Sequence, residues 1–222
     1  MAKQTDIRGW FFKITYKLRR HFIYYLTNIP VHIICFLKGV KVGKKVQFNG
    51  AITIHREPGS VISIDDGCIF NSARHSVPIR LAKPNVFYTL SKNAEIIFGK
   101  NSGASGSTFV AVKRITIGEN VMIGVNTSII DNDFHNTNPV KRDLYNREEI
   151  PSNPVSIGNN VFIGFNCTIL KGVTIGDNSV IGANSVVLSS IPSNSIAIGN
   201  PCKVILKRNW KNAGQNNEDN QK

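Results

Sequence analysis

The chain has 222 residues, which is enough for one sizeable domain with an appendage. It carries 27 Lys and Arg against 14 Asp and Glu, a formal charge of +13, and residues 1–48 hold ten basic residues and one acid, or +9 of that excess. A segment this basic suits a polyanion or an anionic membrane surface. The cysteines form no CxxC pair, which excludes a cysteine zinc motif and indicates reduced core residues of a cytosolic protein: Cys35, Cys68, Cys167 and Cys202.

Residues 1–41 predict an amphipathic helical segment. Apolar residues recur there at helical spacing with basic residues between them, which is typical of a helix with a basic polar face. The apolar residues are Phe11, Ile14, Leu18, Phe22 and Tyr25. Pro30 should end this helix. Two interpretations stay open, and both can hold: a cap over the end of the domain that follows, or an interfacial helix on the inner leaflet of a membrane.

The same segment lacks three other signals. Its apolar runs fall short of the about 20 residues that span a bilayer, and no small-residue cleavage site follows. We therefore expect neither a spanning helix nor a signal peptide. No base-reading motif accompanies the positive charge, so we expect no nucleic-acid partner.

A six-residue pattern begins imperfectly in residues 42–112. Val42–Val46 and Ile64–Cys68 fit it, and Ile96–Gly99 resumes it. Ser102–Ser107 (SGASGS) contains only small residues, which suits either a loop that faces a ligand or a tight corner.

The pattern becomes strict at Ile117, Ile123 and Ile129, and the next position in the count, where a core aliphatic residue is expected, holds His135. The text over residues 131–135 is DNDFH. The repeat then disappears until residue 157, and the gap is not a multiple of six. We therefore predict that the chain leaves the repeat and returns through a polar excursion loop over residues 136–153. Polar loops on rigid scaffolds are common places for active sites.

Residues 157–187 carry the repeat in its strictest form. Large aliphatic residues recur every six positions, at Ile157, Ile163, Ile169, Ile175, Ile181 and Val187. Small or β-branched residues stand four positions after the first five of these, at Val161, Cys167, Val173, Ser179 and Ser185. A helix repeats near 3.6 and a strand at 2, whereas six residues make one short strand and a turn. The sequence therefore predicts a parallel β-helix with three faces, in which the aliphatic residues stack inside and the small residues fill the corners.

Glycine follows four of these aliphatic residues and suits a turn with unusual backbone angles. These glycines are Gly158, Gly164, Gly176 and Gly182. Residues 191–205 follow as a closing stretch. The polar residues 207–222 predict a tail that is largely disordered at its end.

The text IGNNVF-IGFNCT-ILKGVT-IGDNSV-IGANSV resembles that of the hexapeptide-repeat acyltransferases, and the resemblance covers about residues 42–206. It implies an all-β solenoid, a left-handed parallel β-helix of hexapeptide coils with an N-terminal helical segment. The expected domains are the helical segment 1–41, the acyltransferase domain 42–206 and the tail 207–222. The resemblance also implies a homotrimer in which each active site is shared between two prisms.

Acyl transfer from a thioester to a hydroxyl or amine needs a base that takes the acceptor's proton, and histidine suits this task because it titrates near neutral pH. His135 is the candidate, from its register position, the DNDFH text and the loop that follows. Its other ring nitrogen must be held, by Asp131, by Asp133 or by a backbone carbonyl. In the sugar, nodulation-type and antibiotic O-acetyltransferases that this chain resembles, a histidine before an excursion loop is the base.

The resemblance implies acetyl-CoA as co-substrate, bound in the groove between two prisms. Its pantetheine arm would touch the turns Gly164-Phe165 and Gly182-Ala183, and its phosphates would meet the basic side chains Lys203, Lys207 and Arg208. The galactoside and maltose acetyltransferases add an asparagine from the neighbouring subunit. The matching stretch here has no asparagine, which leaves that second group open between Ser105 and Ser107.

These features predict an acetyl-CoA-dependent O-acetyltransferase that acts on a sugar hydroxyl in cell-surface polysaccharide synthesis, in the cytoplasm or at the inner membrane face. The alternatives are an N-acetyltransferase on a nucleotide-linked amino sugar, an antibiotic acetyltransferase, and a non-catalytic scaffold. A metal lyase like the γ-type carbonic anhydrases needs two histidines five residues apart, and position 140 holds Val140 rather than a partner for His135. We therefore expect no metal.

Overall fold

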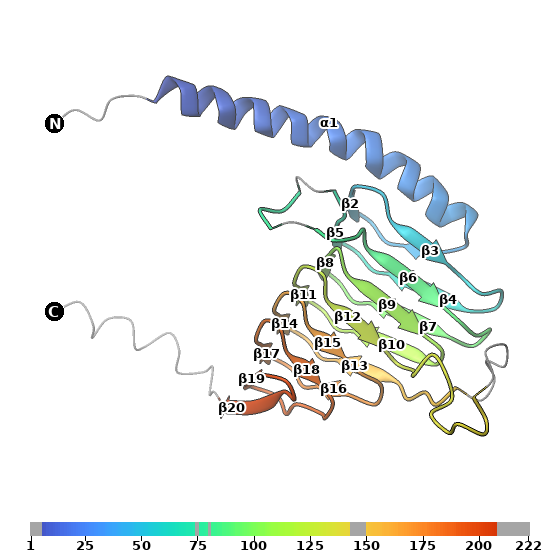
Figure 1. The fold of residues 1–222 in the computed structure, drawn as a ribbon. Helices are drawn as coiled ribbons and strands as arrows, with labels where there is room; N and C mark the ends of the chain where they lie inside the picture. Colours follow the sequence, from blue (N-terminus) through green and yellow to red (C-terminus); the bar gives the residue numbers. More distant parts are fainter. Residues whose placement is uncertain (1–5, 74–75, 80, 143–149, 208–222) are drawn as a thin grey trace, which may run out of the picture.

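The computed structural model describes residues 6–73, 76–79, 81–142 and 150–207, apart from the side chains of residues 19–21, 23 and 24. Short strands wind into a three-sided prism, and the helix α1 (Ile7–Leu37) lies across one end of it (Figure 1). Each face of the prism is one sheet, and as far as β18 successive strands along the chain pass from one face to the next.

The first sheet has the order β1-β4-β7-β10-β13-β16. Its strands are β1 (Lys41–Val42), β4 (Val61–Ile64), β7 (Glu95–Phe98), β10 (Arg114–Ile117), β13 (Val155–Ile157) and β16 (Thr174–Ile175). The second sheet has the order β2-β5-β8-β11-β14-β17-β19-β20. Its strands are β2 (Gln47–Asn49), β5 (Ile69–Asn71), β8 (Gly103–Ser105), β11 (Met122–Ile123), β14 (Phe162–Ile163), β17 (Val180–Ile181), β19 (Ser195–Ile198) and β20 (Lys203–Lys207).

The third sheet has the order β18-β15-β12-β9-β6-β3. Its strands are β3 (Thr53–His55), β6 (Val86–Thr89), β9 (Thr108–Ala111), β12 (Ser128–Ile130), β15 (Thr168–Ile169) and β18 (Val186–Val187). The pairings within the three sheets are parallel except for β19 with β20, which is antiparallel and closes the far end of the prism. The predicted final coil therefore ends in a reversed strand. The predicted tail lies outside the described residues from position 208 onward.

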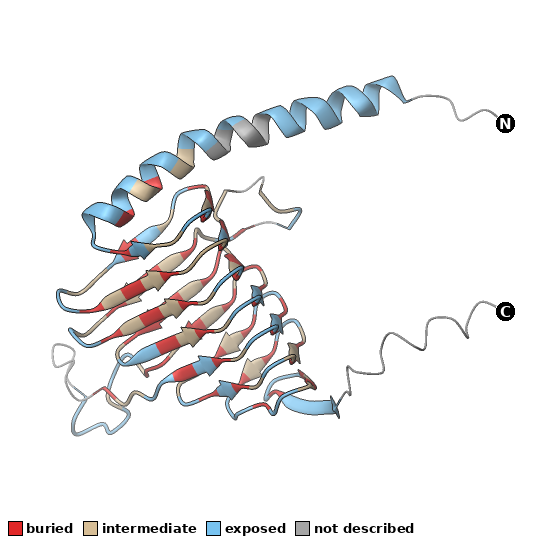
Figure 2. Ribbon diagram, turned by 180° about the vertical axis from the view of Figure 1, so that it is seen from behind, coloured by how far each residue is buried: buried red, intermediate tan, exposed pale blue. Residues whose placement is uncertain are grey.

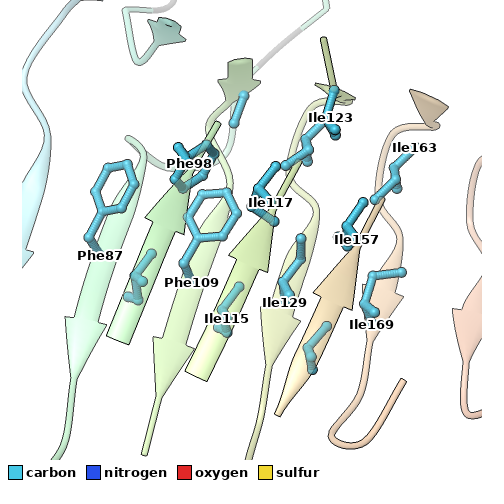
Figure 3. Packing of buried hydrophobic residues seen from close by; sticks show 14 of the residues in the cluster. Phe87, Phe98, Phe109, Ile115, Ile117, Ile123, Ile129, Ile157, Ile163 and Ile169 are labelled. Atoms are coloured by element: carbon cyan, nitrogen blue, oxygen red, sulfur yellow. The ribbon is translucent and has the colours of Figure 1, made fainter. Parts of the chain in front are cut away.

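The hydrophobic core runs along the prism axis, as the six-residue spacing predicts. The aliphatic residues at positions 157, 163, 169, 175, 181 and 187 are all buried, and so are the small residues four positions after the first five. Register pairing stacks Ile117 on Ile157 (Figure 3). It stacks Ile157 in turn on Ile175, one coil later. In the earlier coils phenylalanine takes this place, and the rings of Phe87 and Phe109 stack with centroids 5.3 Å apart.

The predicted role of the glycines is wrong. None of Gly158, Gly164, Gly176 and Gly182 has a positive φ. They are small because the next coil passes too close for a side chain: a Cβ on Gly164 would lie 2.5 Å from the backbone nitrogen of Ala183.

Asparagine takes the unusual backbone angles instead. Asn120, Asn160 and Asn178 all have φ between 55° and 58°, the left-handed region that asparagine tolerates better than most residues. Their side chains form a ladder up one edge of the prism, in which each amide nitrogen donates to the amide oxygen of the next coil at 3.2–3.3 Å for the first two steps. A second ladder joins Asn166 to Asn184 at 2.7 Å.

The helix α1 continues through Pro30, so the prediction that Pro30 ends it is wrong. A proline inside a helix removes one backbone hydrogen bond, and contacts with the first coil outweigh that loss. Val31 and Cys35 are buried beyond the proline, and just before it the side-chain oxygen of Asn28 accepts the backbone N–H of Phe48 at 2.8 Å. This half of the helix therefore caps the prism.

Among the described residues, no helix combines the length and apolar character that crossing a membrane requires. The four cysteines are free and buried, as predicted. Burial raises the pKa of the thiols of Cys35 and Cys68 to about 11.

Candidate active site

Asp131 marks the point where the chain leaves the prism. It follows β12 directly and its side chain is fully buried. One carboxylate oxygen accepts the backbone N–H of Val112 at 2.7 Å, and the other accepts those of Lys113 and Arg114 at 2.7 and 2.8 Å. Both oxygens are thus used by the neighbouring coil, and Asp131 makes no contact with the ring of His135.

The excursion loop has a tightly bonded stem. Asn132 pairs with Ser152 in an antiparallel bridge, and Asn153 donates its N–H to the carbonyl of Asp131 at 2.9 Å. Gly172, in the next coil, donates in turn to the carbonyl of Asn153 at 3.1 Å. The described part of the loop therefore rests on the prism at both of its ends, while residues 143–149 lie outside the described residues.

His135 lies at the top of this stem and is exposed, so the inward place that the six-residue count assigns to position 135 is wrong. The chain turns outward at Phe134, whose φ of 62° is unusual for a bulky residue. The side-chain oxygen of Asn132 accepts the N–H of Phe134 at 2.9 Å, and the carbonyl of Asp133 accepts that of His135 at 2.7 Å. A strained residue beside an exposed imidazole is a frequent feature of functional sites.

Asp133 is half-buried, and its carboxylate forms an ion pair with the ammonium group of Lys171. That pair ties the loop to the turn after β15. Within the described part of the chain, neither ring nitrogen of His135 has a hydrogen-bond partner. The structure thus brings Asp131, Asp133 and His135 into one short turn but joins neither carboxylate to the imidazole.

The residues predicted to bind the cofactor occupy a different corner, between the second and third sheets. Gly164 and Gly182 stand at the ends of β14 and β17, which are paired neighbours, and Phe165 and Ala183 next to them are exposed. The N–H of Asn184 donates to the carbonyl of Phe165 at 2.9 Å, so the two turns stack one coil apart as predicted. Lys203 and Lys207 are exposed on β20, at the closed end of the same sheet.

A groove of about 380 Å³ lies on the outer face of the second sheet. Its lining includes Gly103 and the exposed side chains of Ile69 and Met122, which pair with Gly103 in register. Asn71 and Ser105 also line it, and the amide of Asn71 donates to the hydroxyl of Ser105 at 3.2 Å. The sequence reasoning missed Asn71, although it stands one coil before Ser105 in register.

The stretch around the groove also settles the two readings of residues 102–107. Gly103–Ser105 is the strand β8, and Ser107 is a buried corner residue whose hydroxyl donates to the carbonyls of Ser105 and Gly124. Of the two serines considered as a second catalytic group, only Ser105 reaches the surface.

The loop and the groove lie on opposite sides of one prism. The loop leaves the corner between the third and first sheets, and the groove faces outward from the second sheet. In the parts of the chain that the structure describes, no three His, Cys, Asp or Glu side chains gather as metal ligands would.

The coil geometry, with a histidine-bearing loop at one corner, defines the class of hexapeptide-repeat proteins. The "Bacterial transferase hexapeptide (six repeats)" family model matches residues 154–189, and "Hexapeptide repeat of succinyl-transferase" matches residues 114–130. The structure of a galactoside acetyltransferase in complex with coenzyme A is 35% identical, with a TM-score of 0.50, and the match covers 67% of this chain and 68% of that one. The chain belongs to the hexapeptide-repeat acetyltransferase family, and its coil is the left-handed β-helix of that family.

Two further relatives show how far the likeness extends. The galactoside O-acetyltransferase of Escherichia coli K12 is 42% identical over 128 residues, which are 57% of this chain and 60% of that protein. The chain therefore spans less than two thirds of this curated relative. An N-acyltransferase from Bacillus cereus, solved with dTDP and 3-hydroxybutyryl-CoA, has a TM-score of 0.59 over 78% of this chain and 86% of its own, but at 19% identity it shows the fold alone.

Proposed function

We propose that this protein transfers an acetyl group from acetyl-CoA to a sugar hydroxyl, with His135 as general base. The observation that carries the proposal is an exposed imidazole on a loop stem that is bonded to a rigid prism, in a chain similar to galactoside O-acetyltransferase. Acetyl-CoA as co-substrate is supported by the galactoside acetyltransferase solved with coenzyme A. The class of acceptor is supported by the same relatives.

The chemistry follows from the imidazole of His135 and the hydroxyl group of the acceptor. A ring nitrogen of His135 takes the proton of the acceptor hydroxyl while that oxygen attacks the thioester carbonyl of acetyl-CoA. The tetrahedral intermediate collapses as its carbon–sulfur bond breaks, and the protonated imidazole returns the proton to the departing thiolate. Asp131 and Asp133 serve this step by fixing the turn that carries the imidazole, the first through backbone N–H groups and the second through Lys171.

The site is completed by a second copy of the chain in a homotrimer. Within one prism the histidine loop and the outer groove face opposite ways, so only neighbouring prisms can bring them together. The groove edge of one chain, with Asn71 and Ser105, would then face His135 of the next, and Phe165 and Ala183 would line the path of the pantetheine arm. Lys203 and Lys207, which are exposed on β20, would meet the phosphates.

We place the reaction in cell-surface polysaccharide synthesis, in the cytoplasm at the inner membrane face. The basic and aromatic N-terminal segment supports an acceptor that is held at a membrane.

The test is acetyl transfer by the purified protein from acetyl-CoA to a panel of sugar hydroxyls and amines, read as product mass. His135→Ala should lower the rate by about 10²–10⁴-fold, the usual contribution of a general base. His55→Ala is the matched control, because His55 is an exposed histidine on β3 in the first coils. An unchanged rate in His135→Ala would overturn the role of the base.

The product itself separates the two kinds of acceptor. Mild alkali removes an acetyl ester and leaves an acetamide intact, so an alkali-stable product would identify an N-acetyltransferase instead. No transfer to any acceptor by the wild-type chain would favour the scaffold interpretation.

A further inference from the structure

The N-terminal half of α1 carries a row of apolar side chains that are exposed to solvent. The row follows helical spacing of three and four residues, and its members are Ile7, Phe11, Ile14, Leu18, Phe22 and Tyr25. All six are exposed, Phe11 by 66% and Leu18 and Phe22 by 65% each. Figure 2 shows this half of the helix extending beyond the prism with exposed residues along it. We call this row the apolar stripe.

The prism does not cover the apolar stripe even where the helix is anchored. Val31 and Cys35 face the first coil and are buried, whereas Ile29 and Phe36, which continue the stripe at helical spacing, are 59% and 81% exposed. The helix therefore has two separate apolar faces. One caps the prism, and the other is presented along the whole length of the helix.

The charge around the apolar stripe is of one sign. Residues 7–37 contain five basic residues and no acid, and the exposed side chains of Arg8, Lys13 and Lys17 flank the stripe. Trp10, which is also exposed, adds the side chain that most favours the boundary between lipid headgroups and acyl chains. We propose that α1 docks this protein on an anionic lipid surface, with the apolar stripe in the headgroup boundary and the basic side chains on the lipid phosphates.

A second copy of the helix is a poorer occupant of the same face. Two stripes packed together would bring ten basic residues of two helices close to one another, with no acid on either helix to pair with them. Anionic lipid supplies the missing negative charge, at a contribution of about 1 kcal/mol for each basic residue near the surface. A stripe on one face, with charged flanks, is the form of a helix that lies in the interface rather than crossing it.

Lipid docking can be tested independently of acetyl transfer, because lipid binding can be measured without an acceptor. The experiment is flotation of the full chain with vesicles of phosphatidylcholine alone and of phosphatidylcholine with phosphatidylglycerol, at low and high salt. We expect binding to the anionic vesicles only, and weaker binding as salt rises.

Two variants separate charge from apolar contact. Lys13→Ala with Lys17→Ala should weaken binding by about thirtyfold. The matched control, Lys92→Ala with Lys100→Ala, removes two exposed lysines of the prism and should change binding little. Phe11→Ser with Leu18→Ser and Phe22→Ser should weaken binding by about a hundredfold or more. Acetyl transfer in solution should survive in all three, since none of these side chains belongs to the active site.

The fluorescence emission of Trp10 reports whether the helix enters the lipid headgroup region. The chain has two tryptophans, so Trp210→Phe leaves Trp10 as the reporter. Its emission should shift to the blue with anionic vesicles and stay unchanged with neutral ones. Equal binding by the stripe variant and wild type would overturn the proposal. So would a fall in the molecular mass of the stripe variant in solution, because the stripe would then be a contact between copies.

Discussion

The carboxylate of Asp131 organises the turn that carries the histidine. It is completely buried, and it accepts three backbone N–H groups from the coil below. Charge-assisted hydrogen bonds of this kind are stronger than neutral ones. The same burial makes the loss of the carboxylate costly, because three donors would be left without partners.

Asp131→Ala should therefore lower the free energy of unfolding by about 3 kcal/mol, and Asp131→Asn, which keeps one acceptor oxygen, by about half as much. Asp133→Ala is the control from the same turn. Its ion pair with Lys171 is partly exposed, so its loss should cost less than about 1 kcal/mol. Urea unfolding measures all three. Equal losses for Asp131→Ala and Asp133→Ala would contradict this account of the turn.

The sequence identified the histidine but misjudged its surroundings. The six-residue count predicted an inward position at 135, because a count cannot register that the chain leaves the prism at Asp131. It also could not find Asn71, whose approach to Ser105 depends on the register between coils rather than on nearby sequence. The role of His135 as base remains a prediction that the kinetics above will test.

At the scale of the element, the asparagine ladders hold successive coils together at their edges. Asparagine stands three residues after an aliphatic residue in six hexapeptides, at 120, 126, 160, 166, 178 and 184, and each of these has a positive φ. The spacing of these asparagines is a local signal in the sequence for the left-handed corners, which the glycines beside them do not form.

Asn160→Ala should lower the free energy of unfolding by about 2 kcal/mol. Alanine is strained at a positive φ, and it cannot form the side-chain hydrogen bonds of the ladder. Asn160→Gly should cost only about 1 kcal/mol, because glycine adopts the same φ without strain. Thermal or urea unfolding of both variants measures the difference. If the glycine variant proved the less stable of the two, backbone strain at this corner would not be the reason for asparagine.

At the scale of the whole molecule, the buried thiols of the core make the stability of the prism fall at alkaline pH. Burial raises the pKa of Cys35 and Cys68 to about 11, from a value of 9.0 for an unperturbed thiol. A buried thiol stays neutral where the unfolded chain already ionises, so its stabilising contribution is complete below pH 9 and is lost as the pH rises toward 11.

The free energy of unfolding should thus fall between pH 9 and about 11. Lysines and tyrosines titrate in the same range, so the informative quantity is the slope of stability against pH. Cys35→Ala with Cys68→Ala should make that slope shallower, even if the variant is less stable at every pH. An identical slope would show that these two thiols do not ionise on unfolding.

Most of the prism was predictable because its period is local. Each hexapeptide repeats the same inward aliphatic residue, so the core of residues 157–187 can be read directly from the sequence. The continuation of α1 through Pro30 was not predictable in this way, because it depends on Val31 and Cys35 packing against a coil that is distant in the sequence.

The pairing across the excursion loop has an evolutionary consequence. Ser128 pairs with Thr168, 40 residues later, whereas Thr168 pairs with Val186 after 18, and the strands lie in one unbroken sheet. The extra residues lie between β12 and β13, and the register of the sheet is kept across them. A lineage can lengthen, shorten or exchange that insert without changing the packing of the core, so the surface that the loop presents can diverge while the prism stays the same.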